Sequence, residues 1–280
     1  MGMRNALRVA VMTLLALGRV APAQSVGRML VDDFKHGGGD AIAVWIAPFS
    51  ASQRDWLLAG AAAGAFGLSM LADRSVSDWA LSNDSSRFFR AIGPLRHGGF
   101  AYTGKAVVPP VAVAYVAGLA LKNQDLRDAV TGCMTSWLSQ SALRKGTYVL
   151  VGRERPDTTD DPNRWSVPGD LGDWQKHSFP AGHFANAMSC ATFWNKRFDL
   201  GYAGPVVYAL AGAVGIGRLA DGGHWTSDTV LGGILGYAVG REVARRSLDR
   251  KHAKQQVAQR IGMLIEPEVT GNSIGLRVVY

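Results

Sequence analysis

Apolar stretches with few charges alternate with polar connections along most of the chain. Their length is typical of helices rather than strands, and the first of them is rich in alanine and glycine. They predict six helices, at residues 56–72, 106–121, 125–151, 180–198, 204–217 and 227–247. Residues 261–280 differ, because short apolar runs flank Thr270-Gly271-Asn272 and predict a β-hairpin or a paired strand. The expected fold class is therefore all-α, a six-helix bundle with a small C-terminal β element.

The same pattern divides the chain into four regions. Residues 1–23 are typical of a secretory signal peptide, with Arg4 and Arg8 before a short apolar run and Ala21-Pro22-Ala23 as the cleavage motif. An uncleaved anchor is the alternative, although the run is shorter than the roughly 20 residues that span a bilayer. Residues 24–55 form a lead-in segment interrupted by the glycines at 37–39. The helical domain covers residues 56–247, and a basic tail with the C-terminal hairpin covers residues 248–280.

Composition narrows the classes of partner. The chain has 280 residues, and 48% of them are hydrophobic, which is enough for a sizeable core in one domain. Its formal net charge is +8. Basic residues gather in 241–260, but no nucleic-acid motif accompanies them, so nucleic acid is not an expected partner. This patch is either a contact with an anionic membrane surface or a solvated helix end. The two cysteines, Cys133 and Cys190, lie in apolar helical stretches and are expected to be buried free thiols.

Residues with catalytic chemistry occupy the Gly-rich bend between the fifth and sixth helices. Arg218, His224 and Asp228 follow one another there. A guanidinium can hold two oxygens of a phosphate-like anion, and an imidazole can attack phosphorus or carry a proton. A carboxylate can hold that imidazole in one tautomer. Taken alone, the bend is equally typical of a loop with one ion pair and one exposed histidine.

Two further positions favour a site. Arg155 follows the third helix and His183 opens the fourth, so in an up-and-down bundle both lie at the same end as the bend. Gly182 adds backbone N–H groups and the positive end of a helix dipole, which together attract anions. The sequence therefore predicts an oxyanion site at one end of the bundle.

At these residues the chain resembles a known family, the type 2 phosphatidic acid phosphatases, whose superfamily also includes bacterial acid phosphatases and vanadium haloperoxidases. The resemblance rests on a three-part signature, here Arg155-Pro156, Pro180-Ala181-Gly182-His183 and the spacing Arg218-x-x-x-x-x-His224-x-x-x-Asp228.

The chain departs from that signature at three positions. The signature has a lysine at position 148 and serines at 181 and 217, where this chain has Tyr148, Ala181 and Gly217. Lys145, about one helical turn before position 148, is the candidate for the missing cation, with Arg153 as the alternative.

The resemblance implies a two-step phosphoryl transfer. His224 would attack phosphorus and form a phosphohistidine, Asp228 would orient its imidazole, and His183 would protonate the leaving oxygen and then activate water. The phosphate would be bound by Arg155, Arg218, Lys145 and Gly182. No metal and no cofactor are expected, because cationic side chains stabilise the charge.

The predicted function is hydrolysis of a phosphomonoester or a lipid (di)phosphate, with a phosphate-bearing small molecule or lipid as the partner. The alternatives are a vanadium-dependent haloperoxidase, with vanadate as its cofactor, and a catalytically weak anion-binding envelope protein. Most charge-free runs are too short to span a bilayer, so we expect an exported helical domain in the periplasm or cell envelope, with membrane association as an option.

Overall fold

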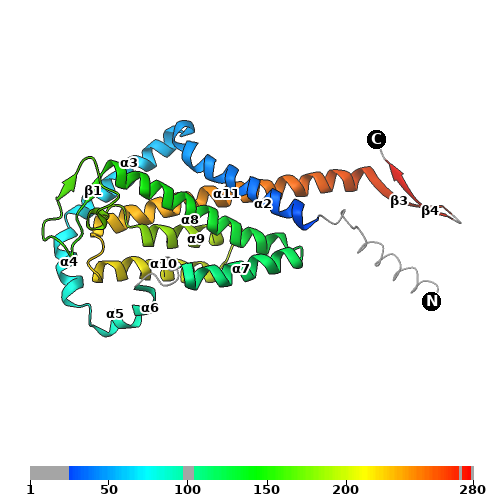
Figure 1. Cartoon of the computed structure of the whole chain (residues 1–280). Helices are drawn as coiled ribbons and strands as arrows, with labels where there is room; N and C mark the ends of the chain where they lie inside the picture. The colour runs from blue at the N-terminus through cyan, green and yellow to red at the C-terminus, as the bar shows by residue number, and fades with distance from the viewer. Residues whose placement is uncertain (1–24, 97–103, 271–272, 279–280) are drawn as a thin grey trace.

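The computed structural model describes residues 25–96, 104–270 and 273–278, which form an α-helical bundle (Figure 1). The predicted helices are α3 (Gln53–Met70), α7 (Gly104–Ala120), α8 (Gln124–Leu150), α9 (Gly182–Phe198), α10 (Ala203–Ala220) and α11 (Thr226–Leu264). The strands β3 (Ile265–Thr270) and β4 (Ser273–Val278) pair antiparallel near the C-terminus. The all-α fold class and its terminal β element are confirmed. The predicted signal segment, residues 1–23, lies outside the described residues.

Most of the lead-in segment is one continuous helix. Residues Val26–Ile46 form α2, and the short 3-10 helix η1 (Ala47–Ser50) follows it. The glycines at 37–39 do not interrupt α2, because its packing against α8 and α11 outweighs their low helix propensity. A Cβ at Gly37 would lie 3.0 Å from Thr135 Oγ1 on α8, so this glycine permits a close approach of the two helices.

Helix α11 is longer than the sequence pattern indicated. The pattern ended the last helix near residue 247, whereas α11 continues for 39 residues to Leu264. Charged pairs one turn apart support the extension, since Arg245 bonds Glu242 at 2.6 Å and Asp249 at 3.0 Å. Figure 1 shows α11 running the length of the bundle and carrying the β3–β4 pair beyond its end. The basic patch at 241–260 is therefore helical.

The polar connections contain short elements that gather at one end of the bundle (Figure 1). Between α3 and α7 lie α4 (Asp73–Ser82), α5 (Arg87–Ala91) and α6 (Gly93–Arg96). Between α8 and α9 lie β1 (Gly152–Arg153), β2 (Trp165–Ser166) and the 3-10 helix η2 (Trp174–Lys176). β1 pairs antiparallel with β2, which folds the long connection back over the end of α8.

Helix α9 lies at the centre of the bundle and packs against α8, α10 and α11. Its contact with α11 depends on three glycines spaced four residues apart. A Cβ at Gly232, Gly236 or Gly240 would meet the carbonyl oxygen of an α9 residue at 2.7, 2.4 or 2.2 Å. Only glycine allows the two backbones to approach this closely. The start of α11 is thereby held beside the start of α9, and both of these termini belong to the site.

The two cysteines form a disulfide, so the expectation of free thiols was wrong. Cys133 of α8 bonds Cys190 of α9, with their Cα atoms 4.5 Å apart. The two residues are 57 positions apart in sequence, and only the packing of α8 on α9 brings them together. The bridge ties the helix that leads into the first motif to the helix that carries the second.

Much of the apolar side-chain surface faces outward. None of the residues of α3 is buried, and Leu57, Leu68 and Leu71 are 69%, 71% and 84% exposed. By length and composition, α10 is able to cross a membrane, and the bent pair α3–α4 would add a second span. Core helices of soluble proteins share these properties, so length and composition alone do not place either element in a bilayer.

Candidate active site

Backbone hydrogen bonds join the three sequence motifs at one end of the bundle. Beside the second motif, Ser178 N donates to the carbonyl oxygen of Arg153, beside the first, at 3.1 Å. Asp157 N, which follows the first motif, donates to Gly222 O of the third at 3.1 Å. Ala181 N of the second motif donates to Asp228 O of the third at 3.0 Å. Gly222 has φ of +64°, and a Cβ there would lie 3.0 Å from Asp157. Glycine therefore lets the bend of the third motif lie against the first.

His224 is buried with one ring nitrogen bonded and the other unbonded. Its side chain is 1% exposed, and Nδ1 lies 2.6 Å from the carbonyl oxygen of Ser178. A carbonyl can only accept, so Nδ1 carries the hydrogen and Nε2 keeps its lone pair. Nε2 is buried without a hydrogen-bond partner. Burial, followed by Arg155 and Arg218, holds the pKa of His224 well below its usual value, so the imidazole is neutral.

His183 is the second residue of α9 and faces His224, with their ring centroids 6.3 Å apart. Burial is the main cause that lowers the pKa of His183 to about 3, and Arg218, Arg144 and Arg155 lower it further. A histidine surrounded by cations is neutral until an anion enters beside it. The ring therefore lies where its charge would depend on an occupant of the site.

Arg155 and Arg218 bring guanidinium groups to the two histidines. Arg155 donates to the carbonyl oxygens of Trp174 at 3.0 Å and His177 at 3.2 Å, which fixes its side chain against the connection between α8 and α9. Arg218 pairs with Asp221 at 2.8 Å, but its Nε is buried without a hydrogen-bond partner. Both cations lower the pKa of each histidine, which places their charge at the site.

Arg144, and not the expected Lys145, is the cation of α8 that lies beside Gly182. Lys145 is exposed, whereas a Cβ at Gly182 would meet Arg144 Cδ at 2.2 Å. Arg144 Nε is buried and unbonded, like that of Arg218. Residue 144 is four positions and residue 145 three positions before 148, and both spacings place a side chain near the same helix face. The sequence alone therefore did not distinguish Arg144 from Lys145. Gly182 lacks a side chain, which leaves room for the guanidinium at the start of α9.

Tyr148 occupies the position at which the family signature has a lysine. It is 4% exposed, and its ring stacks on that of His177 with centroids 4.2 Å apart and planes within 7°. The guanidinium of Arg144 lies 5.5 Å from the same ring. Tyr148 therefore supports Arg144 and His177 rather than supplying a charge.

Asp228 acts on His224 through another residue, which corrects the expectation of a direct contact. Its Oδ2 accepts bonds from Ser178 Oγ at 2.5 Å and from Trp225 N at 3.0 Å. Ser178 in turn accepts the Nδ1 hydrogen of His224 on its backbone carbonyl. Sequence patterns could not reveal Ser178, because the contact to His224 uses a carbonyl that every residue type has.

Arg153 does not face the phosphate position, so it is not the alternative cation. It is fully buried, and its guanidinium pairs with Asp228 at 2.7 Å and Asp73 at 2.6 Å. With both partners ionised, its charge is neutralised inside the protein.

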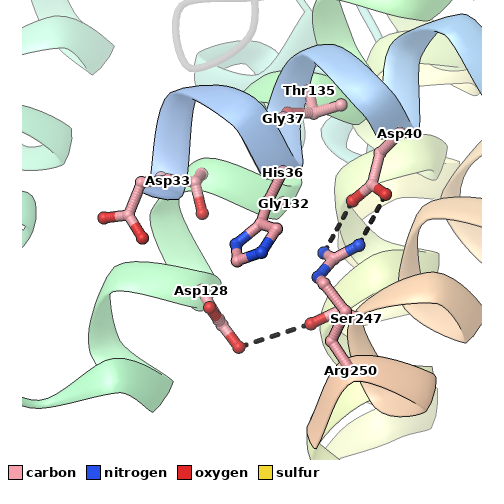
Figure 2. Close-up of a pocket in the computed structure, with 10 residues that line it drawn as sticks. Asp33, His36, Gly37, Asp40, Asp128, Gly132, Thr135, Ser247 and Arg250 are labelled. Atoms are coloured by element: carbon pink, nitrogen blue, oxygen red, sulfur yellow. Dashed lines mark hydrogen bonds and ion pairs between the residues drawn. The ribbon is translucent and has the colours of Figure 1, made fainter. Parts of the chain in front are cut away.

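A separate polar cavity of about 10 Å³ lies between α2, α8 and α11 (Figure 2). Asp33, Asp40 and Asp128 line it, and each pairs with an arginine. The room is that of about one water molecule. Ser247 also lines this cavity, roughly 30 Å along α11 from the start of that helix. The cavity is therefore distinct from the site at His224. Among the described residues, no group of three or more His, Cys, Asp or Glu side chains could hold a metal ion.

Comparison with known proteins shows which family the motif-bearing part of the chain is similar to. Residues 128–251, which contain all three motifs, match the profile of the PAP2 superfamily. The lipid A 1-phosphatase of Porphyromonas gingivalis is 32% identical over 141 residues, which cover 48% of this chain and 28% of that protein. The chain thus spans little more than a quarter of the length of this relative.

A solved structure of related type is the transmembrane PAP2 type phosphatidylglycerolphosphate phosphatase of Bacillus subtilis. It has a TM-score of 0.43 and 21% sequence identity, over 79% of this chain and 96% of that one. The match to the PAP2 superfamily thus covers residues 128–251, which is somewhat less than half of this chain.

Proposed function

We propose that this protein is a phosphatase that hydrolyses a phosphate ester of a lipid through a phosphohistidine intermediate. The observation that carries the proposal is that buried donors and a buried acceptor without hydrogen-bond partners lie around the two histidines. His224 Nε2, Arg144 Nε and Arg218 Nε are all buried and lack hydrogen-bond partners. An unbonded buried polar atom is costly, and a phosphoryl group would satisfy these atoms together.

In the first step, His224 Nε2 attacks phosphorus while the bond between phosphorus and the leaving oxygen breaks. The tautomer is suitable, because Ser178 holds the hydrogen on Nδ1 and leaves the lone pair on Nε2. His183, which is neutral before substrate binds, takes up the proton of the substrate monoanion and gives it to the leaving oxygen. In the second step, His183 takes a proton from water, the water oxygen attacks phosphorus, and the bond to Nε2 breaks to release phosphate.

The cations stabilise the charge on the phosphoryl oxygens. Arg144, Arg155 and Arg218 surround the two histidines, and the N-terminus of α9 at Gly182 adds backbone N–H groups. In this proposal the guanidinium groups supply the charge stabilisation, and the reaction uses neither a metal nor a cofactor.

Three observations support a lipid substrate in the cell envelope. Exposed apolar side chains surround the connection that bears Arg155, including Leu150 at 67%, Val167 at 79% and Trp174 at 56% exposed. Such a surface suits a lipid bilayer or the acyl chain of a substrate. The disulfide between Cys133 and Cys190 favours an oxidising compartment, which agrees with export. The relative from Porphyromonas gingivalis is itself named for a lipid phosphate.

Hydrolysis of p-nitrophenyl phosphate by the purified full chain tests the activity, with His224→Ala as the decisive variant. We expect turnover in the wild type and none above background in His224→Ala, since no other group can attack phosphorus from that position. His252→Ala is the matched control, because His252 is exposed near the far end of α11. If His224→Ala kept most of the rate, the nucleophile assignment would be wrong. Activation of bromide oxidation by vanadate, without phosphatase turnover, would instead identify the haloperoxidase alternative.

A further inference from the structure

The first residue of α4, Asp73, is a fully buried carboxylate outside the segment that matches the family. Its Oδ1 accepts a hydrogen bond from Ser227 N at 2.8 Å, and its Oδ2 accepts one from Ser227 Oγ at 2.7 Å. Ser227 is the second residue of α11. Asp73 therefore caps the N-terminus of α11 from a different helix, where a negative charge also opposes the positive end of the dipole.

The same carboxylate holds Arg153. Arg153 Nη2 donates to Asp73 Oδ2 at 2.6 Å, and Nη1 donates to Ser227 Oγ and to Asp228 Oδ1, each at 2.7 Å. The guanidinium also donates to the carbonyl oxygen of Pro162 at 2.7 and 3.0 Å. It lies against the faces of Trp165 and Trp225. This geometry leaves Arg153 little freedom, so the position of Asp73 is transmitted to Asp228.

From Asp228 the chain of contacts reaches the nucleophile. Asp228 Oδ2 accepts from Ser178 Oγ, and the carbonyl oxygen of Ser178 accepts from His224 Nδ1. The links are all short, and every side chain in them is 4% exposed or less. A displacement of Asp73 would therefore move the carbonyl that orients the imidazole.

We propose that Asp73 is a positioning residue for His224, acting through Arg153, Asp228 and Ser178. The composition of the group agrees with this role. Two carboxyl groups and one guanidinium lie in series behind an imidazole that becomes cationic when it is phosphorylated. On the other side of the imidazole the charged groups are Arg155 and Arg218, with the neutral His183. The inference rests on the proposed function, since it concerns the same nucleophile.

Asp73→Asn tests the inference because it removes the charge and keeps the size of the side chain. The probe is p-nitrophenyl phosphate in single turnover, with the full-length enzyme in saturating excess. We expect the observed rate constant to fall about 10- to 100-fold, because small displacements of a nucleophile have effects of that order. The concentration of enzyme at half-maximal rate should change less than twofold, since Arg144, Arg155 and Arg218 are intact.

The matched control is Asp78→Asn, on the exposed side of the same helix, where the carboxylate pairs with Arg74 at 2.9 Å. It should leave the rate constant unchanged. A purely structural role for Asp73 would reduce the active fraction. That raises the total enzyme concentration needed for the half-maximal rate without altering the rate constant at saturation. That result, or an unchanged rate constant with an unchanged half-maximal concentration, would overturn the inference.

Ser227→Ala provides a second variant if Asp73→Asn does not yield folded protein. It removes the hydroxyl between Asp73 and Arg153 but keeps both charges, so a smaller fall of about 3- to 10-fold is expected. An unchanged rate constant in Ser227→Ala would also overturn the inference. Absence of turnover in the wild type and in Asp78→Asn would instead contradict the proposed function itself, so the two failures are distinguishable.

Discussion

Arginines at the two ends of the bundle differ in how fully their donors are bonded. At the end formed by α2, α8 and α11, Arg127 pairs with Asp33 at 2.9 Å, Arg250 with Asp40 at 2.6 Å and Arg197 with Asp128 at 2.7 Å. At the end that carries the motifs, Arg144 and Arg218 each keep a buried Nε without a hydrogen-bond partner. The first arrangement pairs every one of these cations with a carboxylate. The second leaves one donor each of Arg144 and Arg218 unbonded, although Arg218 also pairs with Asp221 and the neighbouring Arg153 is fully paired.

The difference separates stability from function. A buried cation with a carboxylate partner holds helices together, and removing it leaves an uncompensated charge. A cation whose donors are unbonded contributes less to stability. Burial is the main cause that lowers the pKa values of His183 and His224, and the nearby arginines lower them further. We therefore expect substitutions at the two ends to have opposite consequences for folding and for activity.

The largest expected effect comes from exchanging one arginine at each end for alanine. Arg218→Ala should lower kcat/KM about 10²- to 10³-fold, as for loss of one group that stabilises charge in the transition state. Its effect on the unfolding midpoint should be small. Arg197→Ala should lower the free energy of unfolding by about 3–5 kcal/mol and leave kcat/KM within about twofold, because Arg197 joins Asp125, Asp128 and Ser247 far from the site. Thermal unfolding measures the stability of both variants, and p-nitrophenyl phosphate kinetics measure their kcat/KM. Loss of activity in fully folded Arg197→Ala would contradict the separation of stability from function between the two ends.

A smaller effect distinguishes two adjacent residues of α8. Arg144→Ala should raise KM and lower kcat/KM about 10- to 100-fold, the range for loss of a charge-assisted hydrogen bond. Lys145→Ala is the matched control and should have no measurable effect, since Lys145 is exposed. Inhibition by inorganic phosphate gives an independent readout of binding. If the lysine variant were the impaired one, the assignment of the cation would return to Lys145.

The smallest effect concerns the pH dependence of kcat/KM. The pKa of His183 is lowered to about 3, so at neutral pH the proton for the leaving group must arrive with the substrate as its monoanion. Phosphate monoesters lose that proton with a pKa of about 6, so kcat/KM should fall as pH rises above that value. Arg144→Ala removes only one of the smaller causes that lower the pKa of His183, so in this variant the decline, which the substrate sets, should begin at the same pH. A kcat/KM that stays constant to pH 8 in the wild type would refute this requirement.

The spacing of residues in the sequence was sufficient to indicate the chemistry of the site. Arg155, His183, Arg218, His224 and Asp228 lie at helix ends that an antiparallel bundle must bring together, and the structure does bring them together. The helices were equally readable, because their apolar stretches and polar breaks follow local preferences. The catalytic roles of the five site residues stay predictions that the variants above will test.

Other features depended on which helix faces pack together. Residues 144 and 145 differ by about 100° around α8, and only the position of α9 determines which of them reaches Gly182. The disulfide required α8 and α9 to adopt one register, and the continuity of α2 through its glycines required α8 and α11 as neighbours.

The sequence by itself determined the local helices and the types of residue at the site, because short-range spacing and side-chain chemistry are properties of the chain. The tertiary structure alone decided that Ser178 offers its carbonyl to His224 and that Asp73 lies against Ser227, 154 residues away. The physical reason is that a backbone carbonyl has no sequence signature and that buried ion pairs form between faces which only packing brings into contact.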